Sequence, residues 1–208
     1  SHKGESFGWQ PGRPGFARRK TGLTGAQRGT AAHRFLQLAR LELFREDAPA
    51  AFAAEKKRMV ETGLLDAQSA AALDEKRILA FFASGLYRRM LAAMQPPARL
   101  WREFDFITSL PAAEVMADGK DYGDAEVLVQ GVADAVLVFA DHAELVDYKT
   151  DRVPDAGALV SRYAAQLDHY RRALEKRLEV PVSRCTIYSL HLGREIPLPA
   201  AKTAKNTP

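Results

Sequence analysis

Two acidic residues and a lysine interrupt apolar strand patterns in the middle of the chain. Two runs rich in Val and Leu, 126–139 and 143–149, are typical of strands joined by a tight turn. The first run carries Asp134, and the second carries Asp147 and Lys149. Because side chains alternate along a strand, we expect Asp147 and Lys149 on the same face. A charged group in such a run is costly to bury, so the presence of each of these three residues needs a structural or functional explanation.

A turn centred on Ala140 and Asp141 sets the pairing of these strands and places Asp134 opposite Asp147. Opposed carboxylates repel each other across an antiparallel pair, and a divalent cation between them reverses that effect. Oxygen ligands favour Mg²⁺, with Mn²⁺ as a substitute. A lysine on the same face can orient a water or a phosphate oxygen, so the pattern indicates metal-assisted phosphodiester hydrolysis. The alternative is an ordinary Asp-x-Lys at a solvated strand edge.

Length and charge restrict the other possibilities. A chain of 208 residues favours one domain. The first 28 residues carry six Lys or Arg and one acid, Glu5, so the net charge of +4 belongs to an arm and not to the body. The single cysteine, Cys185, excludes a disulfide framework or a cysteine-ligated iron–sulfur cluster within this chain. No apolar stretch reaches membrane-spanning length and no signal peptide precedes the first residue, so we expect a cytoplasmic protein.

The surrounding pattern predicts a mixed α/β fold. Glycine and proline punctuation indicates an extended basic arm over 1–25, followed by one domain over 26–208 with a helical region at 26–98 and a catalytic sheet and helix at 99–192. Thr24 is the expected N-cap of the first helix. Apolar periodicity predicts helical segments at 26–45, 49–63, 66–94 and 157–178, with breaks at Gly63 and Gly85. It also predicts further strands at 100–110 and 184–191 and a loop near 116–123. This order favours a mixed sheet flanked by helices.

Five short motifs occur in an order that matches a known family. They are Gly-Thr-Ala-Ala-His at 29–33, Arg-Glu-Phe-Asp-Phe at 102–106, Gln-Gly-Val-Ala-Asp at 130–134, Asp-Tyr-Lys-Thr-Asp at 147–151 and Gln-Leu-Asp-His-Tyr at 166–170. Over about residues 21–192 the chain resembles the RecB-type nuclease domain of the PD-(D/E)XK superfamily, and most closely the C-terminal nuclease domains of AddA-type bacterial helicase–nucleases. The resemblance implies the restriction-endonuclease-like core of that superfamily, with an added N-terminal helical region.

The resemblance also implies a role for each site residue. The implied metal ligands are His33, Asp134, Asp147 and the backbone carbonyl of Tyr148. The implied catalytic lysine is Lys149, and Gln166 and Tyr170 match a pair that lines the site near the DNA backbone. Glu103 matches an acidic position on the first core strand.

In that family the reaction is Mg²⁺-dependent hydrolysis of DNA, mainly single-stranded, behind a helicase motor during double-strand break repair. Since the chain has no Gly-x-x-x-x-Gly-Lys-Ser/Thr loop, we expect no motor within it. The expected partners are DNA, the helicase motor of the same parent chain and a second helicase–nuclease subunit, with no membrane. Two alternatives stay open: a stand-alone exonuclease, and an inactive nuclease fold that serves as a platform for DNA or protein binding.

Overall fold

The structure is a computed structural model that describes residues 23–116 and 120–198. Most of the expected basic arm, residues 1–22, and part of the expected loop near 116–123 lie outside the described residues. The N-terminal helices are α1 (Gly25–Leu38), the 3₁₀ helix η1 (Leu41–Arg45), α2 (Ala48–Glu61), α3 (Ala67–Ala71), α4 (Glu75–Phe82) and α5 (Gly85–Ala93). The remaining elements are β1 (Arg99–Pro111), α6 (Ala112–Val115), β2 (Glu126–Val138), β3 (Ala143–Lys149), α7 (Ala156–Leu178), β4 (Val182–Ser189) and β5 (Arg194–Pro197).

The five strands form one mixed sheet in the order β1-β2-β3-β4-β5. β3 and β4 are parallel, and the other neighbouring pairs are antiparallel. Parallel neighbours need a long crossover, which α7 supplies. Ala135 pairs with Val146 and Val138 with Ala143, as the predicted turn requires. The predicted mixed sheet flanked by helices is therefore confirmed.

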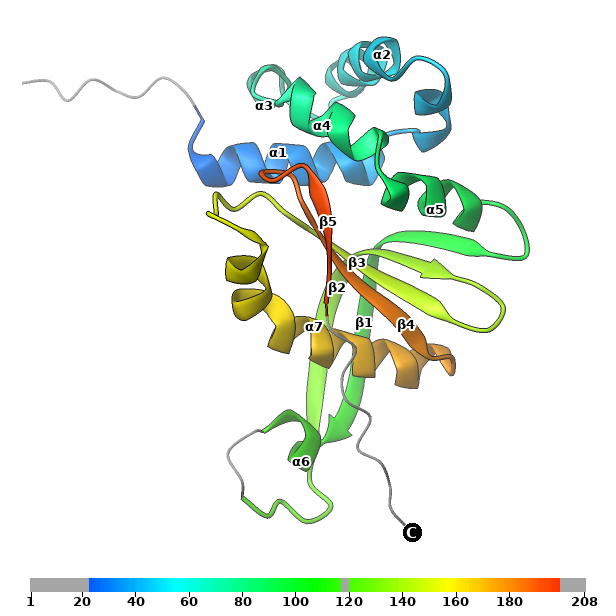
Figure 1. The fold of residues 1–208 in the computed structure, drawn as a ribbon, viewed down its shortest axis with the longest axis vertical. Helices are drawn as coiled ribbons and strands as arrows, with labels where there is room; N and C mark the ends of the chain where they lie inside the picture. The colour runs from blue at the N-terminus through cyan, green and yellow to red at the C-terminus, as the bar shows by residue number, and fades with distance from the viewer. Residues whose placement is uncertain (1–22, 117–119, 199–208) are drawn as a thin grey trace, which may run out of the picture.

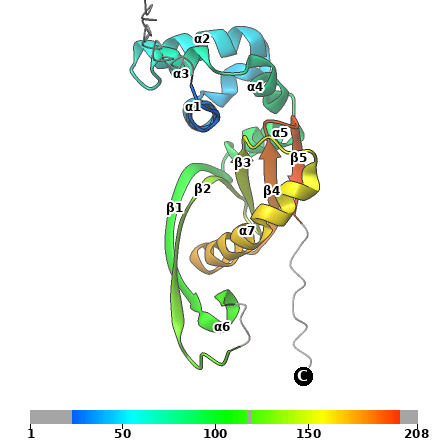
Figure 2. The ribbon, with the colours of Figure 1, turned by 90° about the vertical axis from the view of Figure 1, so that its left-hand side faces the viewer.

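Helices cover the sheet from two sides and create two hydrophobic cores. The first core joins α1, α2, α4 and α5 to side chains such as Leu137, Val146 and Tyr188. The second joins α7 to alternate side chains, among them Leu145 and Ile187. The helices α1–α5 lie at one end of the molecule, whereas β1 and β2 continue past α7 and end at α6 (Figure 1). Figure 2 shows β1 and β2 curving with α7 on their concave side.

The C-terminal end of α1 is fixed by arginines from two distant elements. The last carbonyls of a helix lack intrahelical donors, and Arg102 of β1 donates to the carbonyls of Leu36 and Ala39 at 3.2 and 2.7 Å. Arg58 of α2 donates to the Leu38 carbonyl at 3.0 Å. The helical region and the sheet are thus joined at the helix that carries His33.

A fully buried carboxylate organises this junction. Glu55 accepts hydrogen bonds from the side chains of Arg40 and Arg58, with shortest distances of 2.6 and 2.8 Å. Burial alone raises the pKa of the Glu55 carboxyl, but the two guanidinium groups outweigh it and lower the pKa to about 2. The group therefore stays ionised over the physiological range and holds α2 against the end of α1.

Several element boundaries differ from the sequence prediction. The first helix ends at Leu38, and η1 follows it as a separate 3₁₀ turn. The helical segment expected over 66–94, with a break at Gly85, is three helices: α5 begins at Gly85, and the part before it divides into α3 and α4 because Asp74 caps a new helix start. Neither α6 nor β5 was predicted. The Thr24 cap is confirmed: its hydroxyl accepts a hydrogen bond from the Gln27 backbone N–H, and the Gln27 side-chain oxygen accepts one from the Thr24 backbone N–H.

Over the part of the chain that the structure describes, no helix has the length and apolarity that crossing a membrane requires.

Replacing Glu55 tests the junction. In the Glu55→Ala variant, Arg40 and Arg58 lose a buried counter-charge, so we expect the free energy of unfolding to fall by about 3 kcal/mol. Urea unfolding followed by circular dichroism measures this loss. The matched control is Glu61→Ala on the same helix, whose exposed contact with Lys57 spans 3.8 Å and whose loss should change stability by less than about 0.5 kcal/mol. Equal effects of the two substitutions would show that Glu55 is not the organising charge.

Candidate active site

Asp134 lies where β2 and β3 stop pairing. Their ladder ends at Ala135 and Val146, one step before Asp134 and Asp147 would face each other. At that step the Asp134 carboxylate accepts a hydrogen bond from the Tyr148 backbone N–H at 2.6 Å. The Asp134 side chain therefore takes the place of a backbone carbonyl as the acceptor for this N–H. The predicted register brings Asp134 and Asp147 to the same end of the β2–β3 pair.

Asp147 and Lys149 share one face of β3, as predicted from strand alternation. The Lys149 Nζ lies 2.7 Å from the Asp147 Oδ2, and both side chains are largely buried. No other described group hydrogen-bonds to this carboxylate oxygen. Asp147 is therefore buried, and among the described residues only Lys149 places a positive charge next to its Oδ2.

Tyr163 of α7 completes the surroundings of the lysine. The Lys149 Nζ lies 4.2 Å from the centre of the Tyr163 ring, within the range of a cation–π contact. The Tyr163 hydroxyl donates to Asp151 at 3.0 Å, and Arg162 pairs with the same carboxylate at 2.6 Å. Tyr163 is not among the site residues predicted from the sequence, because its contact with Lys149 joins two segments that are separate along the chain.

His33 and Glu103 approach Asp134 from two other elements. The His33 Nδ1 on α1 lies 3.6 Å from the Asp134 Oδ1. Glu103 occupies the position of β1 opposite Asp134 and adopts a left-handed backbone conformation with φ of 54°. A hollow of about 460 Å³ opens over these three side chains and is lined also by Ala26, Gly29, Thr30, Arg34, Gln37 and Thr150. We call it the Asp134 hollow.

The pKa values show that these groups influence one another. Burial raises the pKa of Asp147 to about 6, and the Asp134 charge adds to the rise while Lys149 opposes it. Burial and the Asp134 charge also raise the pKa of Glu103. Burial alone lowers the pKa of His33, but the contact with Asp134 and the charges of Asp134 and Asp147 outweigh it, so the pKa is raised. The site therefore holds an excess of negative charge that a cation would offset.

Gln166 and Tyr170 lie next to each other on α7, with Gln166 Nε2 3.3 Å from the Tyr170 hydroxyl. Tyr170 packs edge-on against Phe106 and covers Gly131, where an added Cβ would lie 2.6 Å from the Tyr170 ring. The position of the Tyr170 ring thus requires a glycine at position 131. No described contact joins Gln166 or Tyr170 to Asp134, Asp147 or Lys149, so the structure does not bring this pair into contact with the other predicted site residues.

A second glycine brings α1 close to the site. A Cβ on Gly29 would lie 2.6 Å from the Thr150 Oγ1, so only glycine lets α1 pack this closely on the residue that follows β3. This approach sets His33, one helical turn further along, near Asp134. Gly29 and Gly131 each lie inside one of the five motifs, and they are the only sign in the sequence of these two close contacts.

The described residues contain no group of three or more His, Cys, Asp or Glu side chains arranged to hold a metal ion. The donor chemistry nevertheless suits a hard divalent cation, because Asp134 and Asp147 supply carboxylate oxygens and one oxygen of Asp147 lacks any other described hydrogen-bond partner. Mg²⁺ is commonly held by one or two carboxylates together with waters and substrate phosphates. The donor set therefore fits such an ion without a ready-made cage.

Comparisons with known proteins give a consistent result. Residues 10–205 match the model of the PD-(D/E)XK nuclease superfamily. The chain is 36% identical to an ATP-dependent helicase/nuclease subunit from Heliobacterium modesticaldum over 193 residues, which cover 89% of this chain and 13% of that protein. It is 37% identical to the corresponding subunits from Geobacillus thermodenitrificans (85% and 14% covered) and from Pelotomaculum thermopropionicum (92% and 15%). The chain thus spans about a seventh of the length of these relatives.

Asp147 provides a direct test of the electrostatics. In metal-free protein we expect its carboxyl to titrate near pH 6, above its ordinary value. Ionising Asp147 is harder in the folded chain than in the unfolded one, so its contribution to stability is present at low pH and is lost as the pH rises through 6. A ¹³C NMR titration of the carboxyl measures the value. Lys149→Met should raise the pKa further, because a positive charge is removed, whereas an ordinary pKa in both proteins would contradict the described burial.

Proposed function

Since the chain belongs to the PD-(D/E)XK nuclease superfamily, we propose that it is a Mg²⁺-dependent deoxyribonuclease domain that cuts single-stranded DNA. The observation that carries the proposal is the meeting of Asp134, Asp147 and Lys149 at one end of β2 and β3, with an ion pair of 2.7 Å and His33 close by. This arrangement has the residue types that phosphodiester hydrolysis needs: oxygen ligands for a cation and a positive group for developing charge.

Each site residue has a proposed task. Asp134, Asp147, His33 and the Tyr148 carbonyl would hold the ion, which, when bound, polarises the scissile phosphate and lowers the pKa of a water. Lys149 orients the attacking water or neutralises charge on a phosphate oxygen. The Tyr163 ring and the Asp147 carboxylate fix the position of the lysine ammonium group. Glu103 adds a further carboxylate beside Asp134.

The substrate would be bound mainly through its backbone. A nuclease that processes DNA of any sequence needs no base-specific contacts. Gln166 and Tyr170, which are adjacent on α7, would contact the backbone and base faces of the strand. Because phosphate contacts dominate, binding should weaken with salt.

The relatives suggest the biological setting. They are bacterial proteins named as subunits of ATP-dependent helicase/nucleases, and this chain matches a small part of each. We propose that the domain acts as an exonuclease in the cytoplasm, on strands delivered by a helicase motor in the same parent chain, together with a second helicase–nuclease subunit, in double-strand break repair.

Cleavage assays test the proposal. We expect the wild-type chain to cut labelled single-stranded DNA with Mg²⁺ and not with EDTA, and to cut duplex DNA more slowly. Asp134→Ala should abolish cleavage but retain DNA binding, and Lys149→Ala should reduce the rate by at least about a hundred-fold, since it removes a group that stabilises developing charge.

Lys57→Ala, an exposed lysine of α2, is the matched control and should cut at the wild-type rate. DNA binding without cleavage by the wild-type chain, even when supplied with a helicase motor, would instead favour an inactive platform. Equal rates with and without Mg²⁺ would contradict the metal assignment.

A further inference from the structure

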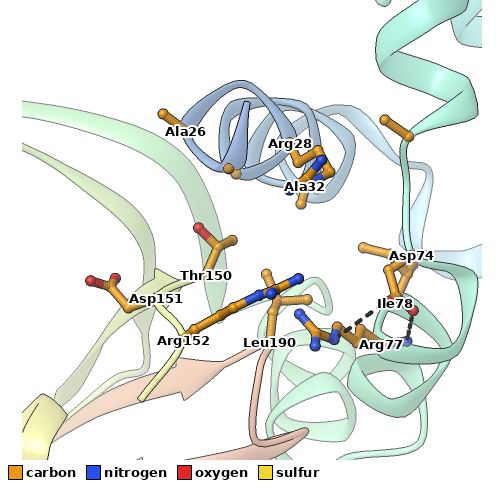
Figure 3. Close-up of a pocket in the computed structure, with 13 residues that line it drawn as sticks. Ala26, Arg28, Ala32, Asp74, Arg77, Ile78, Thr150, Asp151, Arg152 and Leu190 are labelled. Carbon is orange, nitrogen blue, oxygen red and sulfur yellow. Dashed lines mark hydrogen bonds and ion pairs between the residues drawn. The ribbon is translucent and has the colours of Figure 1, made fainter. Parts of the chain in front are cut away.

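A cavity of about 600 Å³ lies on the other side of α1, between α1, α4 and the segment that follows β3 (Figure 3). Three arginines from these elements line it: Arg28, Arg77 and Arg152. Figure 3 shows their side chains approaching the same space, with Ala32 above and Ile78 and Leu190 at its inner wall. We call it the arginine pocket.

Two of the three guanidinium groups have no described carboxylate partner. Arg77 pairs with Asp74 at 3.1 Å and contacts the His191 Nδ1 at the same distance. Among the described residues, the Arg28 guanidinium donates only to the Leu23 backbone carbonyl. No ion pair or hydrogen bond joins the Arg152 side chain to another residue of the described chain. Like charges that share one cavity repel each other, and a bound anion relieves this repulsion.

The acidic residues of the pocket do not supply that anion. Asp74 is engaged by Arg77. The carboxylate of Asp151 is engaged by Arg162 at 2.6 Å and by the Tyr163 hydroxyl. The charge of Arg152 and Arg28 is therefore available to a ligand. A guanidinium fork matches phosphate oxygens well.

The arginine pocket adjoins the Asp134 hollow at the start of α1. The two share three lining residues, Ala26, Gly29 and Thr150. The absence of a side chain at Gly29 keeps α1 close to Thr150, and Thr150 directly follows Lys149 in the chain. A ligand that extends from Asp134 along the start of α1 would therefore reach the three arginines.

We infer that the arginine pocket binds a nucleotide phosphate of the same DNA strand that is cut at Asp134 and Asp147. This inference rests on the proposed function. The guanidinium groups of Arg28 and Arg152 hold the phosphate, and the apolar wall formed by Ile78 and Leu190 contacts the attached sugar or base. The pocket thus fixes the strand beside the cleaved bond. A free nucleotide product has the same chemistry, so the test separates the two sources.

The test measures binding of a fluorescently labelled single-stranded oligonucleotide to the whole chain in EDTA, by anisotropy over 50–200 mM salt (about the range in which phosphate contacts are salt-sensitive). Loss of one phosphate contact lowers the slope of log affinity against log salt by about 0.7. We expect this drop for Arg152→Ala and for Arg28→Ala. Arg152→Lys should retain most of the slope, because it keeps the positive charge.

The matched control is Arg177→Ala, an exposed arginine in the last turn of α7, which should leave the slope unchanged. Thermal unfolding of each variant verifies that the fold is intact. Normal Mg²⁺-dependent cleavage together with unchanged slopes in both pocket variants would overturn the subsite alone. Absence of both cleavage and binding in the wild-type chain would overturn the proposed function and the subsite with it.

Competition with a deoxynucleoside monophosphate identifies the source of the phosphate. If the strand occupies the pocket, the monophosphate competes weakly, and the affinity for oligonucleotides increases with length until the strand reaches the arginines. Binding of the monophosphate that depends on Arg152, without any effect of Arg152→Ala on oligonucleotides, would assign the pocket to product and overturn the strand inference.

Discussion

The burial of two carboxylates at one end of the sheet is the constraint on which the rest of the site depends. A buried anion is stable only with donors or counter-charges around it. Asp134 receives the Tyr148 backbone N–H, and Asp147 receives the Lys149 ammonium group. Both partners come from β3, so this strand lowers the cost of burying its own Asp147 and the Asp134 of the neighbouring β2. The remaining negative charge gives a cation or a protonated group a favourable place, in agreement with the raised pKa of Asp147.

The first helix lies between two sites that are lined by different charged groups. On one side, Asp134 and Glu103 line the Asp134 hollow together with Arg34, and on the other, three arginines line a cavity whose two aspartates are already paired. Such an arrangement suits a polyanion cut with the help of a cation, because the metal is attracted to one side and the phosphates to the other. The helix can hold this position because its C-terminal carbonyls are satisfied by Arg58 and Arg102 and its closest approach is at a glycine.

Sequence reasoning found the features that depend on local periodicity. The register of β2 and β3 followed from one turn, and the shared face of Asp147 and Lys149 followed from strand alternation. It missed β5, since four residues are too short to display a period. It expected the break at Gly85, where α5 begins, but it merged α3 and α4 because a continuous apolar pattern concealed the Asp74 cap. The contact of Tyr163 with Lys149 and the meeting of Arg28, Arg77 and Arg152 depend on tertiary packing between distant segments, which no local pattern encodes.

The packing of Tyr170 on Gly131 has a consequence for how this family can diversify. The ring occupies the space that any side chain at position 131 would need, so neither residue can change freely while the other is kept. A larger residue at position 131 becomes acceptable only after the Tyr170 ring has been lost or has moved and the Phe106 ring, 2.8 Å from the same Cβ position, has also shifted. We therefore expect the two positions to covary among homologues, and an exchange at one of them to mark lineages in which the surface beside the carboxylates has been rebuilt.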